Sequence, residues 1–384
     1  MRTLLTALFM ACLMPLSCLA ATKATVSELD KLLASLNDQH KPDEAVATRL
    51  MEVELTEQLT PLAINKLMQY KPGPSTVRQM LLLSVDSSLL PPPPADLPTL
   101  PALDAAAQAA LVQRAADYVS HVVAHQPRFS AEKQSLRFQN GLAYIKNTSG
   151  NGSSMSSTDT PADIANHVYL SFIGRQTEAV TTEAGVEQAP PMVRQKDPGG
   201  PFGQVSQGVP GLPLTTVLLD AQKAPIAWLR WQTVNGRQTA VFTFAVSPRD
   251  SHYKLNYCCF PSMEHVGSGM GFAPNSGTLT SFHPYEAARG YHGEIFIDSA
   301  TGVVMRIITR AEMKPTDFVQ QEDIRVDFAP VSVGGALYNV PTRSTILTTV
   351  VPNGDAFVKF STRRTIFDVT YTKYQPASTP TASH

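Results

Sequence analysis

The sequence is poor in cysteine, tryptophan and charge. Its 384 residues include four cysteines, two of them within the first twenty residues, and two tryptophans. Charged residues make up 16% of the chain and no long run of lysine or arginine occurs, which argues against nucleic acid or an anionic membrane as a partner. Proline is plentiful at 30 residues, and 43% of the chain is hydrophobic, which is enough for a sizeable core.

Long hydrophobic runs are also missing after the first twenty residues. Residues 1–20 have the pattern of a secretory signal, in which Arg2 precedes the apolar stretch Leu4–Leu16. The sequence therefore predicts export to the periplasm and a mature chain without a transmembrane segment. Cys18 allows a lipid-anchored alternative, which Pro15 disfavours because such sites normally carry leucine there.

The two remaining cysteines, Cys258 and Cys259, are adjacent. They could form a strained disulfide with each other, stay as free thiols or link to another chain. Neighbouring residues of a strand point to opposite faces, which argues against both thiols binding one metal ion.

Residues 22–90 predict a helical module. Thr25–Glu28 is a capping-box sequence, and the leucines that follow it fall on one helical face. Further helices are expected at 43–57, at 61–69 and from Ser75 onward, with Ser75 as the N-cap. Prolines then predict a stiff, extended linker at 91–102.

After a helix at 103–124, the hydrophobic period changes from helical to alternating. Asn235-Gly236 and Ser299–Gly302 are typical of hairpin turns. Ile324–Phe328 alternates, with apolar residues expected inside and charged residues outside. The expected boundaries are a helix plus antiparallel β domain at 103–374, long loops at 147–165 and 188–213, and a disordered tail at 375–384.

These patterns predict an α+β fold, in which an N-terminal helical module is joined to a large curved antiparallel β-sheet. Sequential hairpins favour a meander, and a sheet of this length must curl or be covered on one face. We expect the sheet to pack on helices.

Several stretches resemble a family of exported bacterial proteins of unknown function that is abundant in acidobacteria. They are Leu55–Leu59, Pro72–Gln79, Gln126–Ala131, Trp228–Trp231, Val241–Phe244 and Ser251–Tyr253. This similarity covers most of the mature chain and implies no activity.

A second resemblance concerns the fold. A helix followed by Phe129–Ala131, and then a meander containing Ile297–Gly302, is similar to the periplasmic lipoprotein-carrier fold of LolA, which the envelope-stress regulator RseB also has. This resemblance implies a half-open antiparallel sheet wrapped over helices, with an apolar hollow for acyl chains.

Acyl-chain binding needs an apolar lining with few polar groups. Our candidates are the bulky apolar side chains of the predicted strands: Trp228, Trp231, Phe242, Phe244, Ile295, Ile297, Met305 and Ile307. The same residues could instead fill a closed core, because strand alternation does not distinguish the two. The first hypothesis is an exported non-enzymatic binding protein that holds a lipid, a lipoprotein or another envelope component on the concave face of the sheet.

Two alternatives remain open. In one, the protein is an interaction or envelope-sensor module with a closed core and an envelope protein as partner. In the other, less favoured, it is a metal-dependent enzyme that uses His252, Cys258, His265 and His292, whose spacing matches no known ligand pattern. No Gly-x-Ser-x-Gly sequence occurs. We therefore assign no catalytic residue, no metal ligand and no cofactor from the sequence.

Overall fold

The structure is a computed structural model. It describes residues 22–140, 170–183, 186–188, 214–221, 225–261, 282–315, 317, 319–350 and 363–377, and the side chains of 186, 256–261, 282–285 and 363 are outside this description. The predicted signal, most of the two predicted long loops and the last seven residues lie outside it as well.

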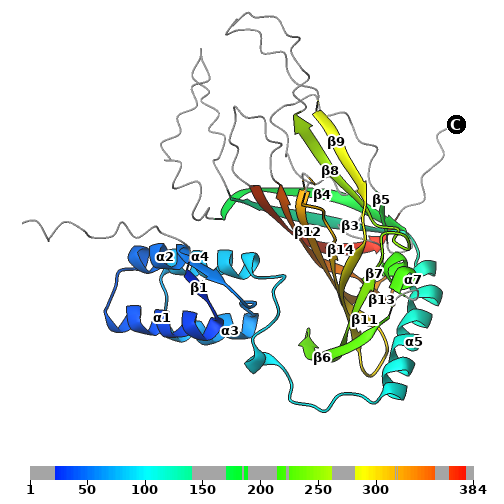
Figure 1. Cartoon of the computed structure of the whole chain (residues 1–384), viewed down its shortest axis with the longest axis horizontal. Helices are drawn as coiled ribbons and strands as arrows, with labels where there is room; N and C mark the ends of the chain where they lie inside the picture. Colours follow the sequence, from blue (N-terminus) through cyan, green and yellow to red (C-terminus); the bar gives the residue numbers. More distant parts are fainter. Residues whose placement is uncertain are drawn as a thin grey trace, which may run out of the picture.

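The described residues form an α+β fold with one large curved antiparallel sheet of ten strands (Figure 1), as the sequence predicts. In spatial order, its strands are β5 (Val186–Gln188), β4 (Ser171–Glu183), β3 (Phe129–Gln139), β14 (Arg363–Pro376), β13 (Ala336–Val350), β12 (Val319–Val333), β11 (Val304–Ala311), β10 (Tyr291–Asp298), β7 (Arg237–Val246) and β6 (Ala227–Val234). A separate hairpin, β8 (Lys254–Pro261) and β9 (Phe282–Ala288), lies between β7 and β10 in the chain.

The two hairpin turns named from the sequence are present. Asn235 and Gly236 both have positive φ and connect β6 to β7. Between β10 and β11, the carboxylate of Asp298 accepts bonds from the amides of Ala300 (2.9 Å) and Thr301 (3.0 Å). Gly302 then takes a φ of 78°. These turns set the register of β6–β7 and β10–β11 and thereby determine which residues share a face.

Strand β14 lies between β3 and β13, and its C-terminal end extends beyond the boundary expected from the sequence. Gln375 pairs with Ser130 and Pro376 with Phe129. The predicted disordered tail at 375–384 therefore begins too early, because its first two residues belong to the sheet.

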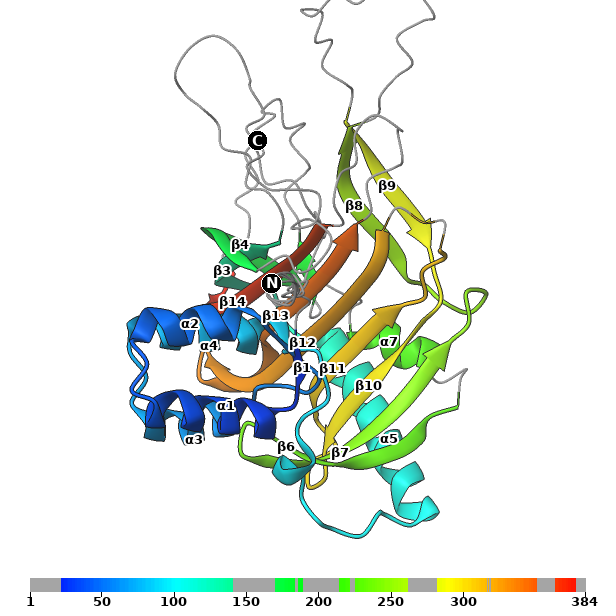
Figure 2. The ribbon, with the colours of Figure 1, turned by 60° about the vertical axis from the view of Figure 1, so that its left-hand side comes forward.

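One face of the sheet, which we call the core face, is covered by α5 (Ala105–His121) and α7 (Leu214–Ala221) (Figure 2). Helix α5 begins at the N-cap Asp104, whose carboxylate accepts a bond from the Ala107 amide at 2.8 Å. Its buried residues Leu111, Ala115 and Val119 join the largest hydrophobic cluster of the described residues. A 3₁₀ turn, η3 (Val123–His125), leads from α5 into β3.

The helical module lies on the opposite side of the sheet (Figures 1 and 2). Its elements are β1 (Thr22–Ala24), α1 (Val26–Asp38), α2 (Asp43–Met51), β2 (Val53–Leu55), α3 (Pro61–Leu67), η1 (Met68–Tyr70) and α4 (Pro74–Asp86). The capping box at Thr25 and Glu28 is present. The helix predicted at 43–57 is too long, because the chain leaves it after Met51 to form β2, which pairs in parallel with β1.

Helix α4 is capped by a residue of another helix. It begins at Pro74, so Ser75 is not its N-cap. Instead, the carboxylate of Asp43 accepts bonds from the amides of Ser75 (2.8 Å) and Thr76 (3.0 Å). Gly73 leaves room for this carboxylate, because a Cβ at that position would lie 2.4 Å from the Asp43 side chain. The module thereby fixes the direction of α4, whose other end points at the sheet.

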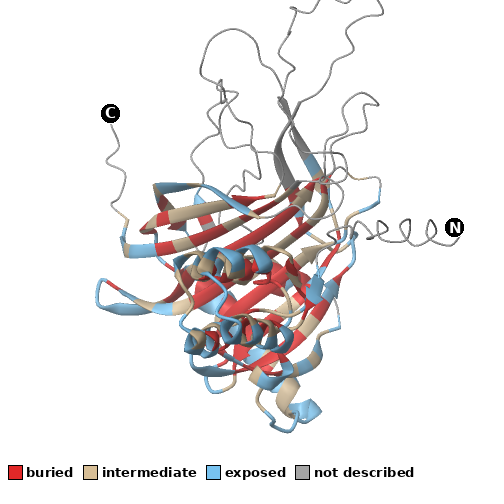
Figure 3. Ribbon diagram, turned by 90° about the vertical axis from the view of Figure 1, so that its left-hand side faces the viewer, coloured by how far each residue is buried: buried red, intermediate tan, exposed pale blue. Residues whose placement is uncertain are grey.

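The predicted linker at 91–102 packs onto both parts of the molecule and includes the 3₁₀ turn η2 (Pro94–Asp96). The carbonyl of Pro91 accepts a bond from the Gln58 amide (2.7 Å), and the carbonyl of Pro101 accepts one from the indole of Trp231 (2.7 Å). Both faces of the sheet are thus partly covered, and buried residues extend along its strands behind the module (Figure 3), whereas most of β4 is exposed.

A charged pocket between the helical module and the sheet

The structure brings together seven of the eight apolar residues selected from the sequence. Trp231, Phe242, Phe244, Ile295, Ile297 and Ile307 belong to the large cluster on the core face, and Trp228 packs against it. Met305 does not, because the β10–β11 register shifts between Phe296 and Ile297. This bulge turns Met305 to the opposite face, where it packs with Phe296 and Ile308.

The seven residues form a filled core in this structure. Their aromatic rings are in direct contact: the centroids of Trp228 and Trp231 are 5.0 Å apart, and those of Trp228 and Phe242 are 5.6 Å apart. Phe242 is 1% exposed, and helices α5 and α7 contribute to the same cluster. An acyl chain would therefore have to displace side chains that already fill this face.

The opposite face of the sheet, which we call the charged face, carries a different set of side chains. Residues in register across β10, β11 and β12 point to the same side. The register places Arg306 opposite both Phe296 and Asp327, and Ile308 opposite both Glu294 and Arg325. Arginines, carboxylates and apolar residues are thus interleaved on this face.

Arg325 and Asp327 were expected to face solvent, and this expectation is wrong. The side chain of Arg325 is 11% exposed and that of Asp327 is 9% exposed. The alternation within Ile324–Phe328 is correct, but the helical module covers the face on which the charged residues lie. Sequence periodicity identified the face without showing what packs on it.

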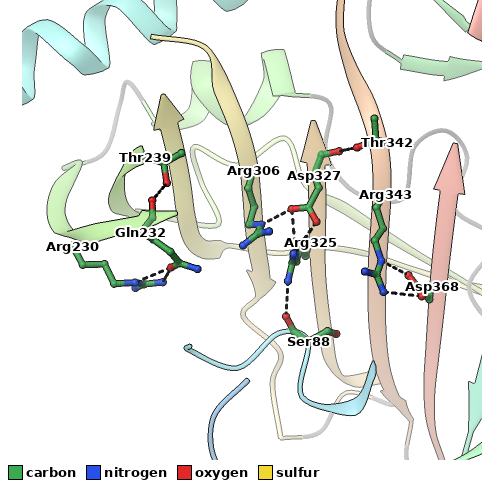
Figure 4. A network of polar contacts seen from close by, with 10 residues as sticks. All are labelled: Ser88, Arg230, Gln232, Thr239, Arg306, Arg325, Asp327, Thr342, Arg343 and Asp368. Atoms are coloured by element: carbon green, nitrogen blue, oxygen red, sulfur yellow. Dashed lines mark hydrogen bonds and ion pairs between the residues drawn. The ribbon is translucent and has the colours of Figure 1, made fainter. Parts of the chain in front are cut away.

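Asp327 bonds to two arginines of this face (Figure 4). Arg306 Nε donates to Asp327 Oδ1, and Arg325 Nη2 donates to Asp327 Oδ2 at 2.8 Å. Burial alone would raise the pKa of Asp327, but the guanidinium groups of Arg325 and Arg306 outweigh it and hold that pKa at about 2. Asp327 therefore stays ionised at neutral pH.

Arg306 is the most buried of these cations. Its guanidinium lies over the ring of Phe296, 5.2 Å from the centroid. Burial, with the like charge of Arg325 next, lowers its pKa to about 10, although Asp327 acts in the opposite direction. The carboxylate it shares with Arg325 does not fully compensate the two cations.

Two further arginines meet at Glu294. Arg230 Nη2 donates to Glu294 Oε2 at 2.7 Å, and Arg310 Nη1 lies 3.7 Å from Glu294 Oε1. Arg230 also donates to the side-chain oxygen of Gln232, and the backbone carbonyl of Gln232 accepts a bond from the Thr239 hydroxyl (Figure 4). Four arginines are thus held by two carboxylates.

Two of these arginines, Arg310 and Arg325, and a third, Arg364, bind the end of α4 and the residues after it. Arg325 donates to the Ser88 carbonyl (3.1 Å) and Arg310 to the Leu89 carbonyl (3.1 Å). Arg364 pairs with the Asp86 carboxylate at 2.7 Å. We call these three contacts the latch, because they join the helical module to the sheet.

An apolar contact accompanies the latch. Leu89 is 5% exposed and lies in a cluster with Phe296, Ile308 and other residues of the charged face, against which Leu82 and Val85 of α4 pack. This contact is smaller than the cluster under α5 and α7.

A small cavity lies within the latch. It has a volume of about 10 Å³, and we call it the arginine pocket. Its lining comprises Gln58, Ser88, Leu90, Pro91, Pro92, Arg230, Gln232, Glu294, Phe296, Arg306, Ile308, Arg310 and Arg325. Ser88 is 7% exposed, and its hydroxyl oxygen has no hydrogen-bond partner among the described residues.

Of the histidines considered from the sequence, the structure describes the side chains of His252 and His292, which have different carboxylate partners. His252 donates from Nδ1 to the fully buried Asp220 at 2.5 Å, and Asp220 also accepts from the Tyr291 hydroxyl at 2.9 Å. This places His252 near the core face. His292, one residue after the core-face residue Tyr291, lies 3.9 Å from Glu312. His265 and the side chains of Cys258 and Cys259 lie outside the described residues.

No family model, curated protein or solved structure matches this chain in comparisons with known proteins. Within the described ranges, none of the helices is both long and apolar enough to cross a membrane. The two resemblances drawn from the sequence therefore remain predictions.

Proposed function

We propose that this chain is an exported, non-enzymatic binding protein of the cell envelope, and that its ligand site is the arginine pocket under the helical module. The signal-like residues 1–20 support export. The observation that carries the binding site is the arginine pocket itself, where four guanidinium groups surround one cavity at the boundary between two separately built parts. Small-molecule sites occur preferentially at such boundaries.

The helical module would act as a cover in this proposal. It has its own hydrophobic cluster, which includes Leu29, Leu50 and Leu59 and contains no residue of the sheet. Among the described residues, its contacts with the charged face include the three latch arginines and the patch around Leu89. A cover held in this way can open without breaking either core, so that a ligand reaches the arginines.

Native mass spectrometry of the mature chain, purified from the periplasm, tests this proposal. We expect a bound small molecule that leaves on denaturation. Arg310→Gln should reduce its occupancy, because this side chain lines the pocket. The matched control is Arg343→Gln, which removes an arginine that pairs with Asp368 at 2.7 Å and is not among the pocket residues.

Equal occupancy in the two variants, or a wild-type mass equal to that of the bare chain, would contradict the proposed site. Retention of the ligand in Arg343→Gln with loss in Arg310→Gln supports it.

A lipid held on the core face is the second candidate, because seven of the residues selected for this role converge there. Binding of this kind requires α5 or α7 to move, since these helices pack on the same cluster. Titration of the full chain with a fluorescent fatty acid distinguishes the two candidates. Saturable uptake that is unaffected by Arg310→Gln would favour the core face.

A further inference from the structure

The arginine pocket carries more positive than negative charge. Four arginines and one glutamate line it, and the only carboxylate that bonds Arg306 and Arg325 among the described residues is Asp327. A further acidic group, Asp323, lies opposite Arg310 in the β11–β12 register. Asp323 accepts its hydrogen bond from Gln321 at 2.7 Å, and burial raises its pKa. The pocket therefore favours an anion.

The pocket also has donors whose present partners are weak or missing. Arg310 Nη2 and Arg325 Nη1 donate to the neutral carbonyls of Leu89 and Ser88, whereas other nitrogens of the two side chains face Glu294 and Asp327. The Ser88 hydroxyl, which is buried, donates to no described residue. Charge-assisted hydrogen bonds to an ionised acceptor are roughly twice as strong as bonds between neutral groups. An anion with several oxygens would satisfy these donors better than the carbonyls do.

We propose that the arginine pocket binds a phosphate-type oxyanion, with the Ser88 hydroxyl and the surrounding guanidinium groups as its donors. This inference rests on the proposed function and names the chemical class of its ligand. Arginine matches such a group because its planar fork of N–H donors can bond two oxygens at once. The same chemistry is offered by a soluble phosphate ester and by the headgroup of a phospholipid.

Binding is coupled to movement of the cover. A cavity of about 10 Å³ has room for about one water molecule, and a phosphate group is larger. The segment from Ser88 to Pro92 must therefore move outward when the anion enters. Because Arg310 and Arg325 hold this segment through its carbonyls, the anion competes directly with the latch.

Calorimetric titration of the full chain with inorganic phosphate, at constant ionic strength, tests the inference. We expect one saturable site in the wild type. Ser88→Ala should weaken binding by about tenfold or more, the effect of losing one hydrogen bond to a charged group. Because this hydroxyl has no partner in the structure, its removal should leave the fold intact.

Arg343→Gln is again the matched control. It removes one positive charge from the same face, outside the pocket, and should change phosphate affinity by less than about twofold. An equal loss in this variant and in Ser88→Ala would mean general electrostatic attraction and would overturn the inference. The absence of saturable phosphate binding by the wild type, together with no vesicle binding, would overturn it as well.

Vesicles identify the source of the anion. Phosphatidic acid in a phosphatidylcholine vesicle presents a phosphate monoester, and phosphatidylcholine alone is the control. Ser88-dependent binding to the first vesicle without binding of inorganic phosphate would assign the site to a lipid headgroup. Binding of inorganic phosphate alone would assign it to a soluble ligand. If neither binds but mass spectrometry shows an Arg310-dependent ligand, the proposed site stands and only its ligand class is wrong.

Discussion

The two faces of the large sheet are closed in different ways. On the core face, α5 and α7 pack on one continuous apolar cluster, in which residues such as Ile297 and Val217 are fully buried. On the charged face, arginines and carboxylates alternate with apolar side chains, and the helical module is held by three polar contacts beside a smaller apolar patch.

Because of this difference, the core face should provide most of the stability, and the charged face should allow the helical module to move away from the sheet. The hydrophobic contribution grows with the apolar area removed from water, so the core face should dominate the free energy of unfolding. Arginine-to-carbonyl contacts contribute modestly and exchange readily for contacts with another acceptor. The contact between the helical module and the charged face can therefore change its conformation while the rest of the molecule stays folded.

The largest effect should come from truncation of the core face. Phe242→Ala removes a ring that is 1% exposed and contacts Trp228, so we expect a loss of about 3–5 kcal/mol in the free energy of unfolding. Urea denaturation followed by circular dichroism measures it. Leu337→Ala, at a position that is 71% exposed, should change little. Similar small losses in both variants would mean that the core face is not a packed core.

Acid should weaken the charged face through Asp327. Its pKa in the folded protein, about 2, lies below the ordinary value of 3.8, so its contribution is complete above about pH 4 and is lost as the pH falls toward 2. The amount is about 2 kcal/mol. Between pH 4 and pH 2, the free energy of unfolding should fall by about this amount less in Asp327→Asn than in the wild type, as measured by urea denaturation at each pH. An identical pH dependence of stability in the wild type and in Asp327→Asn would contradict the ion pairs assigned to Asp327.

Neighbouring serines provide an internal comparison within the helical module. Ser87 Oγ donates to the Leu83 carbonyl (2.7 Å) and accepts from the Leu59 amide (3.0 Å), whereas the Ser88 hydroxyl has no partner among the described residues. Ser87→Ala should cost about 1–2 kcal/mol, because it leaves the buried Leu59 amide unpaired. Ser88→Ala should stay within about 0.5 kcal/mol of the wild type. Thermal denaturation of the two variants side by side checks this contrast.

Loss of a latch contact should also have only a small effect on stability. Arg364→Gln removes a partly exposed ion pair with Asp86, which contributes less than about 1 kcal/mol. Its effect should instead be local, as faster proteolysis between the helical module and α5 with an unchanged unfolding midpoint. An unchanged cleavage rate would show that Arg364 does not hold the module.

Local signals in the sequence predicted most of the fold. Asn235-Gly236 placed the β6–β7 turn, and Thr25–Glu28 placed the start of α1, because a hairpin turn and a capping box are encoded by neighbouring residues. Strand β2 and the capping of α4 by Asp43 were missed. Both depend on contacts between segments that are distant in the chain.

The candidate site was harder to predict for the same reason. Seven of the eight apolar residues selected from the sequence lie together on the core face, and Met305 does not, because its orientation depends on a bulge that periodicity does not reveal. The arginine pocket was not predicted, because its residues come from four strands, from the segment that follows α4 and from Gln58. The alternating charges at 325 and 327 were the one available signal, and they were assigned to a solvent-facing side.

Hydrogen–deuterium exchange of the full chain tests the contrast between the faces most directly. The amides of Gln58 and Leu90, which we call the latch amides, bond to the carbonyls of Pro91 and Ser87 and report on movement of the segment that Arg310 and Arg325 hold. The amides of α5 report on the core face. We predict that the latch amides exchange by a local opening of much lower free energy than that of α5, which should exchange only on global unfolding. Equal protection of the two sets would contradict the account, because the helical module would then be as firmly fixed as the core.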